Sequence, residues 1–180
     1  MATEAAGRVI TICLHGPESV GKSVLAPALA AHFKTVFVPE YGRTYCEQHG
    51  TTLVHDDLVH IGKAQAAMAM EAAERANRLL ILDTDPLMTA VWSDMMLGRR
   101  DDWFGSFDAV ADLYLLCDID LPWVDDGTRL YGDATIRLDF FNRCRDELIA
   151  RGVKWALISG KGATRTTAAL AAIARAFPDL

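Results

Sequence analysis

The sequence lacks the features that mark several broad classes of protein. Its four cysteines are dispersed and have no C-x-x-C spacing, so neither a zinc knuckle nor a disulfide framework is indicated. No run of basic residues stands out, and 18 Lys and Arg against 24 Asp and Glu give a formal net charge of -6. Nonspecific binding to nucleic acid is therefore not expected.

Long apolar segments are also missing. No stretch approaches the roughly 18 apolar residues of a membrane span, and residues 1–7 lack the basic and apolar regions of a signal peptide. We therefore expect a cytoplasmic protein with reduced thiols that does not bind membranes. The 180 residues, 51% hydrophobic and 23% charged, fit one compact domain over residues 1–180, with residues 1–7 flexible. The sequence does not specify an oligomeric state.

Short apolar segments alternate with amphipathic ones along the chain. The apolar segments, rich in β-branched residues, are typical of strands buried on both faces: Arg8–Leu14, Thr35–Val38, Leu79–Leu82, Leu113–Cys117 and Val153–Ser159. Apolar residues at three- and four-residue spacing predict helices over Lys22–Phe33, Asp56–Arg78, Pro86–Leu97, Thr135–Arg151 and Thr164–Phe177. This alternation predicts a three-layer α/β fold with a doubly wound parallel sheet of about five strands. Pro27, inside the first helix, is expected to kink it without breaking it.

One motif decides the class of site. Residues 16–23, G-P-E-S-V-G-K-S, match the phosphate-loop pattern G-x-x-x-x-G-K-[ST], and a buried strand precedes them while a helix follows. We expect ATP to be bound by a set of residues in and after this loop: Gly16, Glu18, Ser19, Val20, Gly21, Lys22, Ser23 and Val24. Lys22 is expected to reach the β- and γ-phosphates, and the Ser23 hydroxyl to coordinate Mg²⁺. His15, beside the loop, is expected to be structural.

Carboxylates follow two of the predicted strands. Asp83, after L-L-I-L, fits the role of magnesium ligand, and the alternative is a capping or turn aspartate. Asp85 is expected either to contact substrate or to cap the next helix. Glu40 could accept the proton of an attacking hydroxyl, with Arg43 clamping a phosphate, unless the two form a surface ion pair. The sequence leaves open whether Glu40 or Asp83 is the general base.

Residues 118–134 form the longest segment without regular pattern. Within it, L-P-W-V-D-D-G-T-R at residues 121–129 combines an aromatic ring, carboxylates, a glycine and an arginine, which suits a lid over bound ATP. Arg129 or Arg137 could neutralise charge on the transferred phosphate, whereas Trp123 could simply pack against the domain. Trp92 and Tyr45 are candidates for a ring-binding pocket, with a core position as the alternative.

Together these motifs resemble the ribosylnicotinamide kinase domain of the bifunctional NMN adenylyltransferase/ribosylnicotinamide kinase family. The resemblance covers nearly the whole chain. It is carried by G-P-E-S-V-G-K-S at Gly16–Ser23, E-Y-G-R at Glu40–Arg43, I-G-K-A-Q at Ile61–Gln65, D-T-D at Asp83–Asp85 and L-P-W-V-D-D-G-T-R at Leu121–Arg129. The phosphate loop alone is common to many families, but the ordered set is much more specific.

The resemblance implies a P-loop kinase fold of the nucleoside and nucleotide kinase kind. It implies transfer of the γ-phosphate of ATP to the ribose 5′-hydroxyl of nicotinamide riboside, which makes the partner a small nucleoside-like molecule. The implied catalytic residues are Lys22, Glu40, Asp83 and Arg129; the implied substrate contacts are Glu40, Arg43, Asp85, Trp92, Trp123 and Asp126; the implied magnesium ligands are Ser23 and Asp83.

The sequence departs from the family in two ways. It has no adenylyltransferase segment, so we expect the reaction to stop at the mononucleotide. Family members have an aromatic residue before the glutamate, where this chain has Pro39. Two alternatives therefore stay open: a kinase for another nucleoside or metabolite, and a nucleotide-dependent regulatory switch. The absence of an N-K-x-D-like motif favours ATP over GTP.

Overall fold

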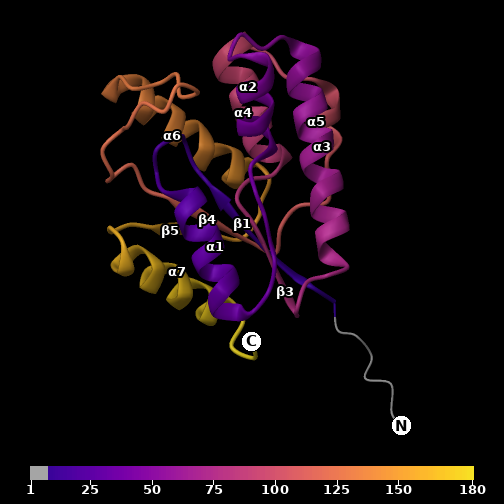
Figure 1. Cartoon of the computed structure of the whole chain (residues 1–180), viewed down its shortest axis with the longest axis vertical. Helices are drawn as coiled ribbons and strands as arrows, with labels where there is room; N and C mark the ends of the chain where they lie inside the picture. The colour runs from indigo at the N-terminus through magenta and orange to yellow at the C-terminus, as the bar shows by residue number, and fades with distance from the viewer. Residues whose placement is uncertain (1–7) are drawn as a thin grey trace.

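The computed structural model describes residues 8–180, so the expectation for residues 1–7 lies outside the described part of the chain. A single five-stranded sheet is flanked by helices (Figure 1). Its strands are β1 Ile10–His15, β2 Phe37–Val38, β3 Leu79–Leu82, β4 Leu113–Cys117 and β5 Trp155–Ile158. All neighbouring strands are parallel, in the order β2-β3-β1-β4-β5. The predicted doubly wound parallel sheet is confirmed.

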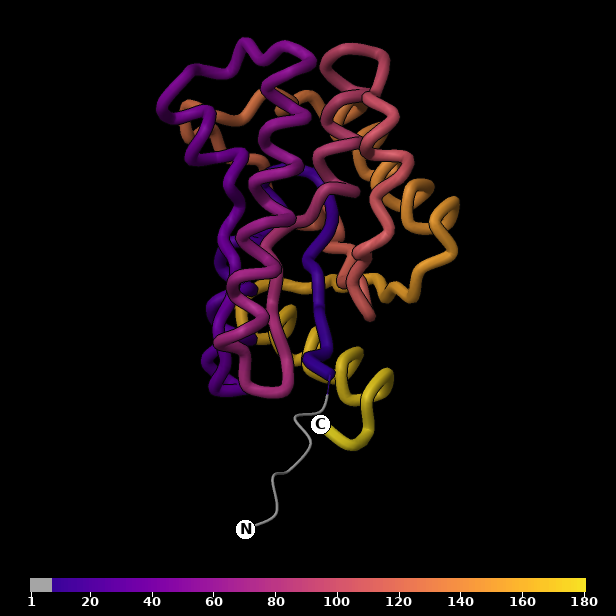
Figure 2. Tube along the Cα trace, turned by 90° about the vertical axis from the view of Figure 1, so that its right-hand side faces the viewer, coloured from indigo at the N-terminus to yellow at the C-terminus, as the bar shows by residue number. Residues whose placement is uncertain are grey.

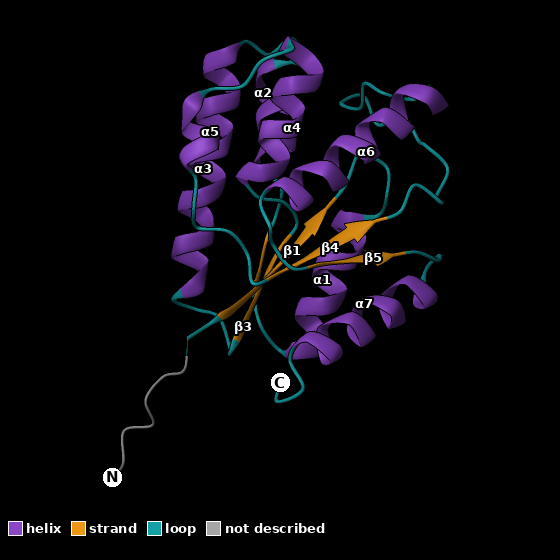
Figure 3. Ribbon diagram, turned by 180° about the vertical axis from the view of Figure 1, so that it is seen from behind, coloured by secondary structure: helices purple, strands orange, loops and turns teal. Residues whose placement is uncertain are grey.

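Helices cover both faces of this sheet (Figure 3). Their bounds are α1 Lys22–Phe33, α2 Tyr41–His49, α3 His55–Ala73, α4 Pro86–Leu97, α5 Asp102–Ser106, α6 Ala134–Ala150 and α7 Ala163–Ala176. Alternate residues of a strand point to opposite faces, which divides the core in two. Ile12 and Leu14 of β1 pack with α1 and α7, whereas Cys13 packs with α3, α4 and α6. The fold therefore has the three layers predicted from the apolar pattern.

The parallel register brings the functional segments to one edge of the sheet. β1 lies between β3 and β4, with Cys13 opposite Leu82 and His15 opposite Leu116. Because the carboxyl ends of parallel strands meet at the same edge, the loop after β1 lies beside the residues that follow β3. In Figure 2, the turn between α2 and α3 lies toward one end of the molecule and α7 toward the other.

Most predicted elements agree with the structure within one or two residues, and α1 continues through Pro27. Two helices were not predicted. α2 consists mostly of polar residues and has no buried residue, so few apolar positions mark it as a helix, and α5 is a single short turn capped by Asp101. α3 ends at Ala73 and not at Arg78, because the chain turns toward β3 through a left-handed Arg78.

The structure also describes the state of the cysteines and the character of the helices. All four cysteines are free. Among the helices of residues 8–180, none combines the length and apolar character required to cross a membrane.

Candidate active site

Residues 16–21 form a tight loop between β1 and α1 that requires glycine at both ends. Gly16 has a φ of 126°, and a Cβ added to it would lie 2.9 Å from the carbonyl oxygen of Cys117. Gly21 has a φ of 81° and immediately precedes α1. Larger residues strain such conformations, so the two glycines of the motif are set by backbone geometry and by the neighbouring strand β4.

The side chain of Lys22 lies within this loop. It is 7% exposed, and its Nζ donates hydrogen bonds to the carbonyl oxygens of Gly16 at 2.8 Å and Pro17 at 2.7 Å. Ser23, the next residue of α1, is exposed and lines a cavity beside the loop together with Lys22. The N-terminus of α1, the ammonium group and a hydroxyl thus converge where an anion such as phosphate is stabilised.

Two carboxylates approach Lys22 from the ends of β3 and β2. Asp83 is 2% exposed, and its Oδ1 atom has no hydrogen-bond partner among residues 8–180. Burial raises the pKa of Asp83, while Lys22 lowers it. Burial likewise raises the pKa of Glu40, which Lys22 lowers and Asp83 raises. The two predicted acidic residues are therefore brought together around the loop lysine.

Asp85 is held within the structure instead of facing the site. Its Oδ1 accepts a hydrogen bond from the Leu87 N–H at 3.1 Å, so it caps α4, and its Oδ2 accepts one from the Tyr114 hydroxyl. Burial raises the pKa of Asp85 to about 6. Of the two alternatives for Asp85, the structure has the helix cap.

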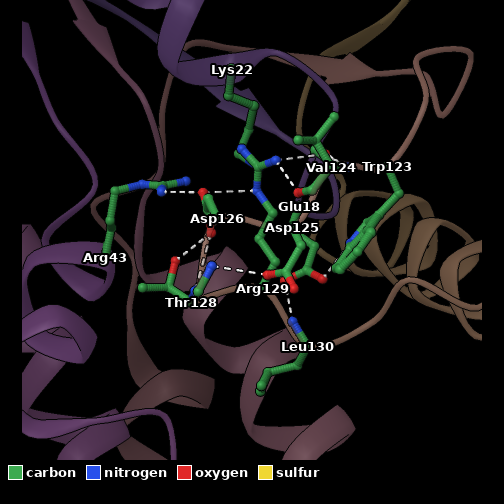
Figure 4. A network of polar contacts seen from close by, with 12 residues as sticks. Glu18, Lys22, Arg43, Trp123, Val124, Asp125, Asp126, Thr128, Arg129 and Leu130 are labelled. Atoms are coloured by element: carbon green, nitrogen blue, oxygen red, sulfur yellow. Dashed lines mark hydrogen bonds and ion pairs between the residues drawn. The ribbon is translucent and has the colours of Figure 1, made fainter.

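The segment after β4 is anchored to the phosphate loop through Glu18 (Figure 4). The Glu18 carboxylate accepts hydrogen bonds from the Trp123 indole at 2.9 Å, the Leu130 N–H at 3.1 Å and the Tyr131 N–H at 2.6 Å. Trp123 also packs closely against Gly132, where an added Cβ would lie 3.1 Å from the ring. The segment predicted as a lid is therefore tied to a side chain of the phosphate loop.

Ser19 provides a second set of anchors for the same segment. Its Oγ accepts hydrogen bonds from the Val124 N–H at 2.9 Å and from Arg129 at 2.8 Å, and its carbonyl oxygen accepts one from Arg137 at 3.2 Å. Ser19 has a φ of 61°, a left-handed conformation that is uncommon outside glycine. Arg137 also donates to the Leu121 carbonyl oxygen at 2.8 Å, so it links the same segment to the phosphate loop.

Asp126 joins two arginines that come from different parts of the fold. Its Oδ2 lies 2.6 Å from NH1 of Arg43, on α2, and 3.1 Å from Nε of Arg129 (Figure 4). Partial burial raises the pKa of Asp126, but hydrogen bonds from Arg43 and Thr128 outweigh it and hold this pKa well below its usual value. Arg43 therefore pairs with Asp126, and the surface ion pair with Glu40 considered above is not formed.

Two adjoining cavities lie beside the phosphate loop. One is lined by the phosphate loop and the start of α1, and the other extends between α2, α3 and α4. They share five lining residues, which are Glu18, Glu40, Arg43, Trp92 and Arg129. Five of the predicted site residues line neither of these two cavities: Gly16, Asp83, Asp85, Trp123 and Asp126. Tyr45, the other ring-pocket candidate, donates to Asp57 at 2.6 Å and also lies outside them.

The second cavity contains residues that sequence reasoning missed. Its apolar wall comes from α2, the α2–α3 connection, α3 and α4: Cys46, Leu53, Leu58, Ile61 and Met96. The three-residue spacing of Leu58 and Ile61 marks one helix face, but that pattern does not distinguish a cavity wall from core. Trp92 forms the aromatic wall and stacks on Tyr131 with ring centroids 5.5 Å apart.

Comparisons with known proteins agree with this architecture. Over 140 residues the chain is 32% identical to the trifunctional NAD biosynthesis/regulator protein NadR of Escherichia coli (strain K12), a match covering 74% of this chain and 34% of NadR. The chain thus spans about a third of the length of that curated relative.

Solved structures show the same fold. A NadR protein in complex with NR has a TM-score of 0.76 at 21% identity, covering 96% of this chain and 53% of that one. The NadR structure with NAD and AMP-PNP has a TM-score of 0.72 at 22% identity, covering 93% and 49%. Thymidylate kinase from Ehrlichia chaffeensis has a TM-score of 0.63 at 13% identity, covering 92% and 97%.

The phosphate loop, the order of the strands and the helices on both faces of the sheet define the class. The chain is a P-loop protein with the three-layer fold that nucleotide kinases share. The family model described as AAA domain matches residues 11–165. The chain belongs to this AAA domain family.

The anchoring of the lid through Glu18 can be tested by hydrogen exchange. In Glu18→Ala, the amides of Leu130 and Tyr131 lose their acceptor, so we expect them to exchange about tenfold faster or more, as expected for a charge-assisted hydrogen bond. The exposed Glu47→Ala on α2 is the matched control. Equal exchange in Glu18→Ala and the wild type would show that other contacts hold the lid.

The lowered pKa of the buried His15 leads to a prediction of how the free energy of unfolding depends on pH. Its ring is fully buried against Tyr114, and burial together with Lys22 lowers its pKa to about 3. Between pH 6.5 and 3 the unfolded chain binds a proton that the folded chain does not. The free energy of unfolding therefore falls with decreasing pH, by up to about 1.4 kcal/mol per pH unit from this residue.

Urea unfolding at pH 7, 6 and 5 measures this contribution. We expect His15→Phe, which keeps an aromatic ring beside Tyr114, to lose less stability than the wild type on acidification. Parallel curves for the two proteins would contradict the prediction.

Proposed function

We propose that the chain is a magnesium-dependent ATP kinase that phosphorylates the ribose 5′-hydroxyl of nicotinamide riboside and produces nicotinamide mononucleotide, a step of NAD biosynthesis. The observation that carries the proposal is the junction of the two cavities, at which Glu40 lies between them and interacts with Lys22 and Asp83. One cavity has the geometry of a phosphate site, and the other is an apolar pocket with an aromatic wall.

The relatives support the choice of reactants. NadR has been solved with NR and with AMP-PNP, an ATP analogue, and this chain shares its fold over nearly all the described residues. The resemblance in sequence adds the ordered motif set that includes Glu40, Asp83 and Arg129. The chain has free cysteines, which supports the expected cytoplasmic location.

In the proposed reaction the 5′-hydroxyl oxygen forms a bond to the γ-phosphorus, and the bond from this phosphorus to the β,γ-bridging oxygen breaks. Glu40 accepts the hydroxyl proton, a role that its raised pKa favours over that of an ordinary surface carboxylate. Lys22 and Arg129 stabilise the negative charge on the transferred group and on the departing ADP. Asp83 is the alternative base if Glu40 only orients the acceptor.

The residues present fit a magnesium ion. Asp83 offers a buried oxygen, Oδ1, that has no hydrogen-bond partner among residues 8–180, and the Ser23 hydroxyl lies within reach of the same carboxylate. Within residues 8–180 no three His, Cys, Asp or Glu side chains gather as a metal site. One carboxylate and one hydroxyl from the protein are sufficient for Mg²⁺ when substrate phosphates and water complete its coordination shell. When bound, the ion would neutralise charge on the phosphates; Ser23 and Asp83 would hold it.

Trp92 supports a ring-bearing acceptor. Pro39 stands where family members carry an aromatic residue, and it does not line either cavity. Trp92 lines both, so an aromatic face is available from α4 instead of from the residue before Glu40. A pyridinium ring is a cation, and cations are attracted to the face of an indole and to nearby carboxylates such as Glu40 and Glu18.

ADP release from magnesium-ATP, with and without nicotinamide riboside, tests the proposal directly. Cytidine, uridine, adenosine and thiamine serve as competing acceptors, and mass spectrometry identifies the product. We expect ADP release that depends on nicotinamide riboside, with the mononucleotide as product. A different phosphorylated acceptor would assign another substrate, and nucleotide binding without any acceptor would favour the regulatory switch.

Lys22→Ala tests the phosphate-loop assignment. The substitution removes a preorganised donor to the phosphates, so we expect a loss of roughly 3 kcal/mol or more of transition-state stabilisation, about a hundredfold in kcat/KM. The surface change Lys63→Ala on α3 is the control. Turnover like that of the wild type in Lys22→Ala would refute the assignment.

Glu40→Gln tests whether Glu40 acts as the general base or only supports the structure of the site. It preserves size while removing the proton acceptor, so we expect ATP binding to persist and phosphoryl transfer to fall about 100-fold or more. Isothermal titration with an ATP analogue and single-turnover transfer measure the two quantities. An equal loss of affinity and turnover would make Glu40 structural.

A further inference from the structure

The two candidate catalytic carboxylates lie just beyond the point where strand pairing ends. The last rung of the β2–β3 ladder is the hydrogen bond from the Asp83 N–H to the Val38 carbonyl oxygen, 2.9 Å long. β2 ends at Val38, and the residues that follow it, from Pro39 on, lie outside the ladder. Main-chain pairing therefore stops where Glu40 and Asp83 have to be placed.

Beyond the end of the ladder, a side chain from α3 connects the two segments by hydrogen bonds. Gln65 is 1% exposed, and its Nε2 donates hydrogen bonds to the Pro39 carbonyl oxygen at 3.2 Å and the Thr84 carbonyl oxygen at 3.3 Å. Its Oε1 accepts a hydrogen bond from the Tyr41 N–H at 2.8 Å. One amide thus joins three backbone atoms, and those atoms belong to the residues on both sides of Glu40 and to the residue after Asp83.

The side chains of the two carboxylates have few anchors of their own. Glu40 is the N-cap residue of α2 but makes no side-chain capping bond, and Asp83 Oδ1 has no hydrogen-bond partner among residues 8–180. Their placement relative to Lys22 consequently depends on the backbone that carries them. A polar amide is stable in such a buried place because its donors and its acceptor are all used.

We propose that Gln65 is a positioning residue that fixes Glu40 relative to Asp83 by bridging the backbone beyond the ends of β2 and β3. The proposal rests on the proposed function for the roles of the two carboxylates. It goes further in assigning the geometry of the site to α3, an element that supplies no group to the reaction. Small displacements of reacting groups are enough to lower turnover by about 100-fold.

The chain contains a matched control at the opposite ends of the same strands. Thr35 precedes β2, its Oγ1 donates a hydrogen bond to the Leu79 carbonyl oxygen at the start of β3, and it accepts one from the Asn77 N–H at 3.0 Å. Thr35→Val removes this bridge with little change in shape. It therefore weakens the β2–β3 connection far from the carboxylates.

The test compares Gln65→Met, which keeps the length of the side chain, with Thr35→Val in the full chain. We expect Gln65→Met to lower kcat for nicotinamide riboside by about 10- to 100-fold, while KM and affinity for ATP change less than about threefold. Thr35→Val is expected to lower the thermal midpoint similarly and leave kcat within about twofold. If Gln65→Met does not fold, Gln65→Asn, which keeps an amide that cannot span the same atoms, replaces it with the same expectation.

A loss of kcat that only parallels the loss of stability in both variants would overturn the proposal, and so would unchanged kcat in a folded Gln65 variant. Acceptor-free ATP hydrolysis, in which water replaces the hydroxyl, separates this result from failure of the proposed function. If the wild type does not phosphorylate nicotinamide riboside, that function fails. The positioning role is then supported if Gln65→Met slows hydrolysis at unchanged ATP affinity, and it is refuted if hydrolysis is unaffected.

Discussion

The parallel pairing of β1 with both β3 and β4 is the constraint on which the rest of the site depends. Because β1 is central and its neighbours run in the same direction, the loop that follows it emerges beside the ends of both. Gly16 is pressed against the Cys117 carbonyl oxygen of β4, which fixes the loop on one side. Asp83 lies at the end of β3 on the other. A shift of one residue in either register would turn these side chains to the wrong face.

Two kinds of contact then complete the site around this frame. Hydrogen bonds from side chains to the backbone form the first kind: Lys22 donates to carbonyl oxygens of the loop, and Gln65 donates to carbonyl oxygens beyond β2 and β3. The side chains of Glu18 and Ser19 hold the segment after β4 by accepting hydrogen bonds from its backbone N–H groups and from two of its side chains. Asp126 connects this segment with α2 by binding both Arg129 and Arg43. The walls of the two cavities are thereby parts of one network.

Within residues 8–180 the sequence predicted the sheet, five of the seven helices and the position of the phosphate loop, because each rests on local periodicity or on fixed glycine spacing. It could not predict α2, whose residues have no buried face and which is held by contacts such as Gln65 with the Tyr41 N–H. Nor could it decide between a helix cap and a substrate contact for Asp85, because the placement of this side chain depends on Tyr114, 29 residues away. The partners of Glu18 and Asp126 were likewise invisible, since they join segments about 80 to 110 residues apart.

The anchoring of the lid to Glu18 and Ser19 has an evolutionary consequence. In the pattern G-x-x-x-x-G-K-[ST], these residues occupy two of the unrestricted positions, which a comparison of unrelated P-loop proteins treats as free to vary. Here their side chains bind Trp123, Val124 and Arg129. Substitutions at positions 18 and 19 are therefore expected to co-vary with those at 123–131 among close homologues. In this chain, the two unrestricted positions of the motif are therefore constrained by the segment that binds to them.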